Sequence, residues 1–160
     1  MDKTTYFYPN KTLRTGNGLL DLSTPAIMGI LNVTPDSFFD GGKFEGVDAA
    51  LAQTETMLEE GADIIDIGGM SSRPGASIIS ADEEMSRVLP VIDAIHKRFA
   101  DVILSIDTIY SQTAAAAIDA GAGIINDISA AALDANIIQV AIDKKLPYIL
   151  MHMQGKPQDM

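Results

Sequence analysis

Residues 26–38 read AIMGILNVTPDSF, an apolar run that passes directly into a polar loop broken by proline. The apolar part, 26–31, is short, uncharged and partly β-branched, as expected for a strand covered on both faces of a parallel sheet. Asn32 follows at the carboxyl end of this strand, where parallel α/β sheets place their chemistry. The stretch therefore predicts an α/β protein with a functional group at its first strand end.

The same passage from an apolar run to a polar segment occurs four more times along the chain. The later strands are expected at 63–67, 102–106, 124–125 and 148–151. Between the strands, helical spacing predicts helices at 48–60, 81–98, 111–120 and 136–144. Ser80 and Glu83 form the pattern of a capping box, in which Ser80 accepts from the first turn and Glu83 reaches back. Strands that alternate with helices indicate βα units and a parallel sheet.

A β-hairpin is expected before the first strand of the sheet. Residues 11–15 and 19–22 flank Gly16-Asn17-Gly18, a sequence that readily supplies the positive φ angles of a tight turn. No helix follows these glycines, so a phosphate-binding loop is the weaker interpretation. We expect the hairpin to cover the amino-terminal end of the sheet.

Composition limits the class of protein. The chain has 160 residues with 47% hydrophobic content, enough for one domain with a sizeable core. No apolar run approaches the roughly 20 residues of a membrane span, and the first residues show no signal sequence. A net charge of -11 argues against nucleic acid or an anionic membrane surface as a partner. The absence of cysteine excludes thiol chemistry and fits a cytoplasmic protein.

Length leaves two architectures open. Five strands and four helices are too few for a closed eight-stranded barrel, which takes about 250 residues. The pattern fits either an open doubly wound domain or the first part of a (β/α)8 barrel. Strand and helix spacing alone does not separate these two possibilities.

Specific motifs favour the barrel. Five segments, in this order and spacing, closely resemble dihydropteroate synthase: MGILNVTPDSF at 28–38, IGGMSSRPGA at 67–76, SIDT at 105–108, INDI at 125–128 and LMHMQG at 150–155. The resemblance runs from about residue 19 to the last residue. It implies an α/β (β/α)8 TIM barrel truncated after the fifth strand, with residues 1–23 as the hairpin part and 24–160 as the strands of one partial pterin-binding domain.

The resemblance also implies a reaction. Members of the family condense 6-hydroxymethyl-7,8-dihydropterin pyrophosphate with p-aminobenzoate to give 7,8-dihydropteroate and pyrophosphate in folate biosynthesis, and sulfonamides compete with p-aminobenzoate. It implies Mg²⁺ as cofactor, a cytoplasmic location and a homodimer at full length. Family residues of the later strands have no counterpart here, so we expect the 160-residue chain alone to associate through its unpaired sheet edges and to be inactive.

Three strand-end residues are the main candidates for the site. By this resemblance Asn32 offers an amide oxygen to Mg²⁺, a hard cation, although a strand-end Asn alone reads as a turn former. Asp107 and Asn126 are expected to bind the donor-rich edge of the pterin. The alternative for Asp107 is the N-cap of the helix at 111–120.

Two loops supply the remaining candidates by resemblance. Arg73 would pair with pyrophosphate, Asp40 would face the cationic intermediate, and both are expected to be catalytic. The p-aminobenzoate slot and the pterin ring would contact Phe38, Ser72, Pro74 and Ile128. Met70 and Ser72 depart from the Glu and Thr that are usual in the family, and the loss of a methyl group at position 72 would loosen the slot.

Two rival functions stay open at this point. One is a folate-binding methyltransferase with the same barrel, against which the loops at 34–38 and 72–75 argue. The other is a noncatalytic paralogue that binds pterin. Pyrophosphate release, measured with and without p-aminobenzoate, discriminates among the three.

Overall fold

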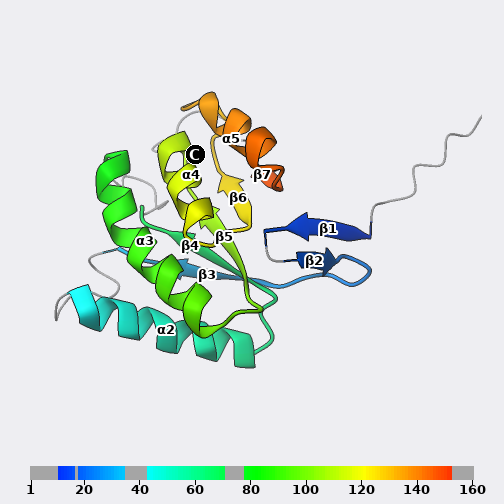
Figure 1. The fold of residues 1–160 in the computed structure, drawn as a ribbon, viewed down its shortest axis with the longest axis vertical. Coiled ribbons are helices and arrows are strands. Elements are labelled where there is room, and N and C mark those ends of the chain that lie inside the picture. The colour runs from blue at the N-terminus through cyan, green and yellow to red at the C-terminus, as the bar shows by residue number, and fades with distance from the viewer. Residues whose placement is uncertain (1–10, 17, 35–42, 71–77, 153–160) are drawn as a thin grey trace, which may run out of the picture.

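A computed structural model describes residues 11–16, 18–34, 43–70 and 78–152 of the chain (Figure 1). A parallel sheet has the strand order β3-β4-β5-β6-β7, so neighbours in sequence are neighbours in space. The strands are β3 (Met28–Asn32), β4 (Ile64–Gly68), β5 (Ile103–Asp107), β6 (Ile124–Asp127) and β7 (Tyr148–Leu150). The helices are α2 (Lys43–Glu59), α3 (Ala81–Arg98), α4 (Ser111–Asp119) and α5 (Asn136–Lys144). The predicted α/β alternation is confirmed.

The helices form a layer in which α2 packs on α3, α3 on α4 and α4 on α5 (Figure 1). Side chains alternate along each strand, so every second residue faces this layer. The main core joins strand residues such as Leu31, Ile67 and Ile106 to the apolar stripe of α3, which includes Val88 and Ile92. The other face of the sheet carries polar residues and an exposed Ile30, and the site is built there.

The predicted hairpin covers the amino-terminal end of the sheet. β1 (Thr12–Thr15) and β2 (Gly18–Asp21) pair antiparallel, and Leu20 forms a second apolar cluster with Ile64 and Ile124 at the start of their strands. The hairpin lies close, because a Cβ atom added to Gly123 would be 2.7 Å from the backbone nitrogen of Gly16. The carboxyl end of the sheet is left for the site.

The sheet is open within the described residues. β3 pairs there only with β4, and β7 pairs only with β6. Ile30 on β3 is 69% exposed and Leu150 on β7 is 63% exposed. Five strands in barrel order, with apolar side chains exposed at both edges, match the expected first part of an eight-stranded barrel.

Helix limits agree with the sequence except at three ends, one of which is the end of α2 at Glu59, one residue before the predicted limit. α3 and α5 have the predicted limits, α2 begins earlier, at Lys43, and α4 ends one residue sooner, at Asp119. No helix in the described parts of the chain is long and apolar enough to cross a membrane.

The capping box is only half correct. Ser80 accepts from the backbone N–H of Glu83 at 3.2 Å, but the Glu83 carboxylate pairs with Arg87, one turn further along α3. A guanidinium offers a charged partner, which outcompetes the neutral N–H of the cap residue.

Close packing of α3 against the end of β4 requires glycine at position 69. A Cβ atom there would lie 2.8 Å from Cγ1 of Val88 and 3.3 Å from the backbone oxygen of Glu84. We expect Gly69→Ala to lower the free energy of unfolding by about 1–3 kcal/mol, because α3 must move outward. Gly18→Ala is the matched control, since nothing lies within 4 Å of a Cβ atom at position 18. Urea titrations that give equal losses for both variants would contradict this packing argument.

Candidate functional site

The register of the sheet brings the predicted strand-end residues into one row. Successive register pairs join Asn32, Gly68, Asp107 and Asn126 across β3, β4, β5 and β6. Backbone hydrogen bonds continue this row, from Val33 N to Gly68 O at 2.7 Å and from Thr108 N to Asn126 O at 3.0 Å. Three predicted site residues, from separate strands, therefore lie at one edge of the sheet.

Gly68 opens a space between two of these side chains. A Cβ atom on Gly68 would lie 3.3 Å from Oδ2 of Asp107 and 3.6 Å from Oδ1 of Asn32. Both oxygens thus lean over the glycine from the strands on either side. The missing side chain leaves a small, oxygen-lined surface that a side chain at position 68 would fill.

Asp66 lies one step below this row and was not among the predicted site residues. It is two residues before Gly68, on the same face of β4, and is only 4% exposed. Its Oδ2 accepts a hydrogen bond of 2.9 Å from Nδ2 of Asn126. Burial raises the pKa of Asp66, an effect partly offset by the Ser105 hydroxyl and the Asn126 amide. The alternation of side chains along a strand could have identified it, because residues two apart, such as Asp66 and Gly68, lie on the same face.

Asp107 is the one carboxyl group of the row, and its pKa is strongly raised. Burial, reinforced by the nearby carboxylates of Asp66, Glu84 and Asp127, raises the pKa of Asp107 from 3.8 to about 7. Water would normally screen such like charges, but here the groups lie against the apolar core. At neutral pH, Asp107 is therefore poised between its acid and its carboxylate.

Glu84 is a second acid that sequence reasoning did not select. Its side chain is fully buried and accepts a hydrogen bond from the Thr108 hydroxyl, next to Asp107. Burial raises the pKa of Glu84, against the opposing effects of Thr108, Thr113 and Arg87. Helical spacing could have identified Glu84 as a buried residue, because it precedes the buried Val88 by four residues and so lies on the same face of α3.

The alternative role for Asp107, as N-cap of α4, is wrong. The cap residue is Tyr110, and no side-chain cap bond forms there. Instead the backbone N–H of Ser111, the first residue of α4, donates to Oδ2 of Asp134 at 2.8 Å. Asp134, which is distant in sequence, thus satisfies a backbone N–H at the start of α4, and Asp107 is the last residue of β5.

Asp127 has a structural role on the opposite face from Asn126. Its carboxylate accepts from the backbone N–H groups of Ser129 at 2.7 Å and Ala131 at 2.8 Å, and from the Tyr148 hydroxyl at 2.6 Å. These bonds hold a turn in which Ala130 and Ala131 have positive φ angles of 49° and 65°. Ile128, a predicted ring contact, is half-buried at the start of this turn.

The other predicted site residues lie outside the described residues: Phe38, Asp40, Ser72, Arg73 and Pro74. In the described part of the chain, no group of three or more His, Asp or Glu side chains could hold a metal ion.

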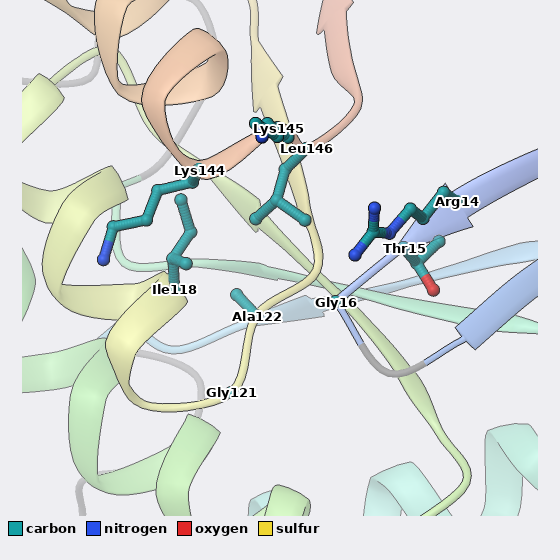
Figure 2. Close-up of a pocket in the computed structure, with 9 residues that line it drawn as sticks. All are labelled: Arg14, Thr15, Gly16, Ile118, Gly121, Ala122, Lys144, Lys145 and Leu146. Carbon is teal, nitrogen blue, oxygen red and sulfur yellow. The ribbon is translucent and has the colours of Figure 1, made fainter.

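A cavity of about 270 Å³ opens at the other end of the sheet (Figure 2). Arg14 reaches toward it from the hairpin, while Lys144 points away toward α4 and pairs with Asp119. The carboxyl ends of α4 and α5 adjoin it, and the negative ends of their dipoles oppose an anion there. The row at Asp107 is therefore the better candidate site.

Comparison with known proteins gives a consistent family. The family model described as "Pterin binding enzyme" matches residues 28–160. The chain is 47% identical over 156 residues to the dihydropteroate synthase of Synechocystis, covering 97% of this chain and 53% of that protein. It is 48% identical over 153 residues to the mitochondrial folate synthesis bifunctional protein of Pisum sativum, covering 94% of this chain and 30% of the relative.

The fold agrees with the same group. A solved structure of Xanthomonas albilineans dihydropteroate synthase with 4-aminobenzoic acid has a TM-score of 0.84 and 44% identity, covering 91% of this chain and 52% of that one. The chain thus spans about half the length of the dihydropteroate synthases that it matches.

The raised pKa of Asp107 predicts a cost in stability. An acid with a pKa raised in the folded state favours folding below its unfolded pKa of 3.8, and this advantage is lost as the pH rises through about 7. We expect Asp107→Asn to raise the free energy of unfolding at pH 8 by on the order of 2 kcal/mol and to change little at pH 4. Asp101→Asn, at an exposed loop position, is the control. Urea titrations in which Asp107→Asn gives no pH-dependent gain would refute the assignment.

Proposed function

This chain belongs to the pterin binding enzyme family, and we propose that it carries the pterin-recognition part of a dihydropteroate synthase. The proposed reaction condenses 6-hydroxymethyl-7,8-dihydropterin pyrophosphate with p-aminobenzoate to give 7,8-dihydropteroate and pyrophosphate. The observation that carries the proposal is the row of Asn32, Asp107 and Asn126 at the carboxyl end of the sheet. The 4-aminobenzoic acid bound to the Xanthomonas relative supports the choice of second substrate.

Pterin recognition would rest on Asp107 and Asn126. A pterin presents an aminopyrimidinone edge rich in N–H donors, and a carboxylate beside an amide oxygen offers the complementary acceptors. The two residues are register partners on adjacent strands, so both groups can reach one edge of a flat ring. Ile128, half-buried just beyond β6, would pack against the ring.

The chemistry would use the negative field of the buried acids. When the C–O bond to pyrophosphate breaks, its electron pair leaves with the pyrophosphate and the pterin methylene becomes part of a delocalised cation. The p-aminobenzoate nitrogen then forms the new C–N bond and loses a proton. Asp66 and Asp107 share the site face of the sheet, and their carboxylates, when ionised, would stabilise that cation, because the low dielectric at the core strengthens the attraction.

The departing pyrophosphate needs positive charge to stabilise it. Because the chain as a whole is acidic, that charge must come from a bound metal ion or a few nearby cationic side chains. Asn32 would bind Mg²⁺ through its amide oxygen, which leans over Gly68 and suits a hard cation that also takes phosphate oxygens. When bound, Mg²⁺ would neutralise charge on the departing pyrophosphate. Arg73 would pair with the same group, Asp40 would face the cation, and Phe38, Ser72 and Pro74 would line the p-aminobenzoate slot. These roles follow from the family resemblance.

The proposal extends to the setting of the enzyme. By the same resemblance we propose a homodimer at full length, a cytoplasmic location, inhibition by sulfonamides, and no nucleic acid or membrane partner. The acidic charge of -11 supports the absence of polyanionic partners. The protein expressed from its complete reading frame should release pyrophosphate only when p-aminobenzoate is present. Pterin binding without release would instead indicate a noncatalytic pterin-binding protein.

The raised pKa of Asp107 predicts how pterin affinity depends on pH. If the carboxylate accepts ligand N–H groups, affinity should rise about tenfold per pH unit below about 7 and level off above it. Asp107→Asn should remove this slope and weaken binding at pH 8 by about 1–3 kcal/mol, because a donor would then face a donor. Calorimetry of a pterin analogue from pH 5.5 to 8 measures both effects. Affinity within twofold of wild type, with the slope intact, would remove Asp107 from the pterin site.

The metal proposal predicts a separate defect. Asn32→Ala should weaken Mg²⁺-dependent binding of pyrophosphate about tenfold or more and leave pterin binding and the fold unchanged, because Asn32 is an exposed end residue of β3. Asn136→Ala, an exposed residue at the start of α5, is the matched control. Titration of pyrophosphate with and without Mg²⁺ is the measurement, and unchanged Mg²⁺ dependence in Asn32→Ala would exclude Asn32 as a ligand.

A further inference from the structure

The orientation of one amide group decides what the site offers to a ligand. The side chain of Asn126 can present either its carbonyl oxygen or its NH₂ group, and the two alternatives have nearly the same shape. Nδ2 of Asn126 donates to Oδ2 of Asp66, at 2.9 Å. Because the oxygen and nitrogen share one carbon atom, this bond turns Oδ1 away from Asp66.

Asp66 is well placed to fix that orientation. It comes from a strand two places away from Asn126 in the sheet and lies 60 residues earlier in the sequence. Its side chain is 4% exposed and has Ser105 as its register partner on β5, so it has little room to move. A carboxyl group retains an acceptor oxygen whether or not it is protonated, so Oδ2 of Asp66 can accept from Asn126 in both states.

Resting on the proposed function, we propose that Asp66 is a positioning residue that sets the specificity of the pterin site. Asp66 accepts a hydrogen bond from the NH₂ group of Asn126. The carbonyl oxygen of Asn126 is then available to the ligand, next to the Asp107 carboxylate. The Asn126 carbonyl oxygen and the ionised Asp107 carboxylate then present two acceptors side by side. This pair selects a ring edge made of N–H donors and rejects an otherwise similar edge that carries a carbonyl oxygen.

Pterin and lumazine are suitable probes of this selection. They share the bicyclic ring, and lumazine carries an oxygen where pterin has its 2-amino group. Without Asp66, the Asn126 amide can turn and offer NH₂ to the lumazine oxygen. Loss of Asp66 should therefore reduce discrimination between the two ligands more than it reduces affinity for pterin.

Three variants of the protein expressed from its complete reading frame test the proposal at pH 8. Asp66→Ala removes the acceptor, and we expect the preference for pterin over lumazine to fall about tenfold, the value of one buried mismatched hydrogen bond. Asp66→Asn keeps an acceptor oxygen at the same position and should retain most of the preference. Asp127→Asn is the control, because this equally buried acid serves the turn after β6 and should lower stability without changing the ratio.

The outcomes separate this proposal from the proposed function. Equal weakening of both ligands in Asp66→Ala, or no rescue in Asp66→Asn, would overturn the positioning role even if the wild type binds pterin. If the wild type binds neither ligand, the proposed function fails, and NMR measurement of the exchange of the Asn126 NH₂ protons in the ligand-free protein still decides whether Asp66 positions this amide. Exchange should be slow in wild type and Asp66→Asn and at least tenfold faster in Asp66→Ala, and equal rates would overturn it.

Discussion

Register between parallel strands is the constraint on which the site depends. Each strand of the sheet pairs with the next so that its last residues meet those of its neighbours, and the connecting helices lie on one face. Asn32, Asp107 and Asn126 are far apart in sequence, yet this pairing alone makes them adjacent. A shift of one residue in any strand would turn its side chain into the helix layer and dismantle the row.

The site is obtained at a cost to stability. Three acids, Asp66, Glu84 and Asp107, are held at the boundary of the core, and burial raises the pKa of each. Such groups destabilise a fold at neutral pH unless other packing offsets them. The isoleucine-rich strands and the tight contact of α3 with Gly69 provide that packing. The same unfavourable concentration of negative charge is what would make the site favourable for a cation.

The sequence was most informative where a local pattern sufficed. The positions of the strands and helices follow from hydrophobic periodicity: strand limits lie within two residues of those predicted, and the limits of α3 and α5 were correct to the residue. It failed where another side chain took over the contact. Arg87, four residues further along α3, pairs with the Glu83 carboxylate, and Asp134, distant in sequence, accepts from the first backbone N–H of α4 in place of Asp107. Asp66 and Glu84 were missed because burial depends on what packs above a residue, although the period of each element already indicated its face.

Helix α3 connects the parts of this arrangement. From its first two turns, Arg87 donates to the backbone oxygen of Gly69 at 2.8 Å, and Glu84 accepts from Thr108. One contact fixes the backbone just after β4, and the other fixes the turn just after Asp107. Both strand ends, which are already register partners in the sheet, are therefore also held by the same helix. A displacement of α3 would disturb the backbone after β4 and the turn after Asp107 at once, so the packing of α3 on Gly69 supports the geometry that strand register creates across Gly68.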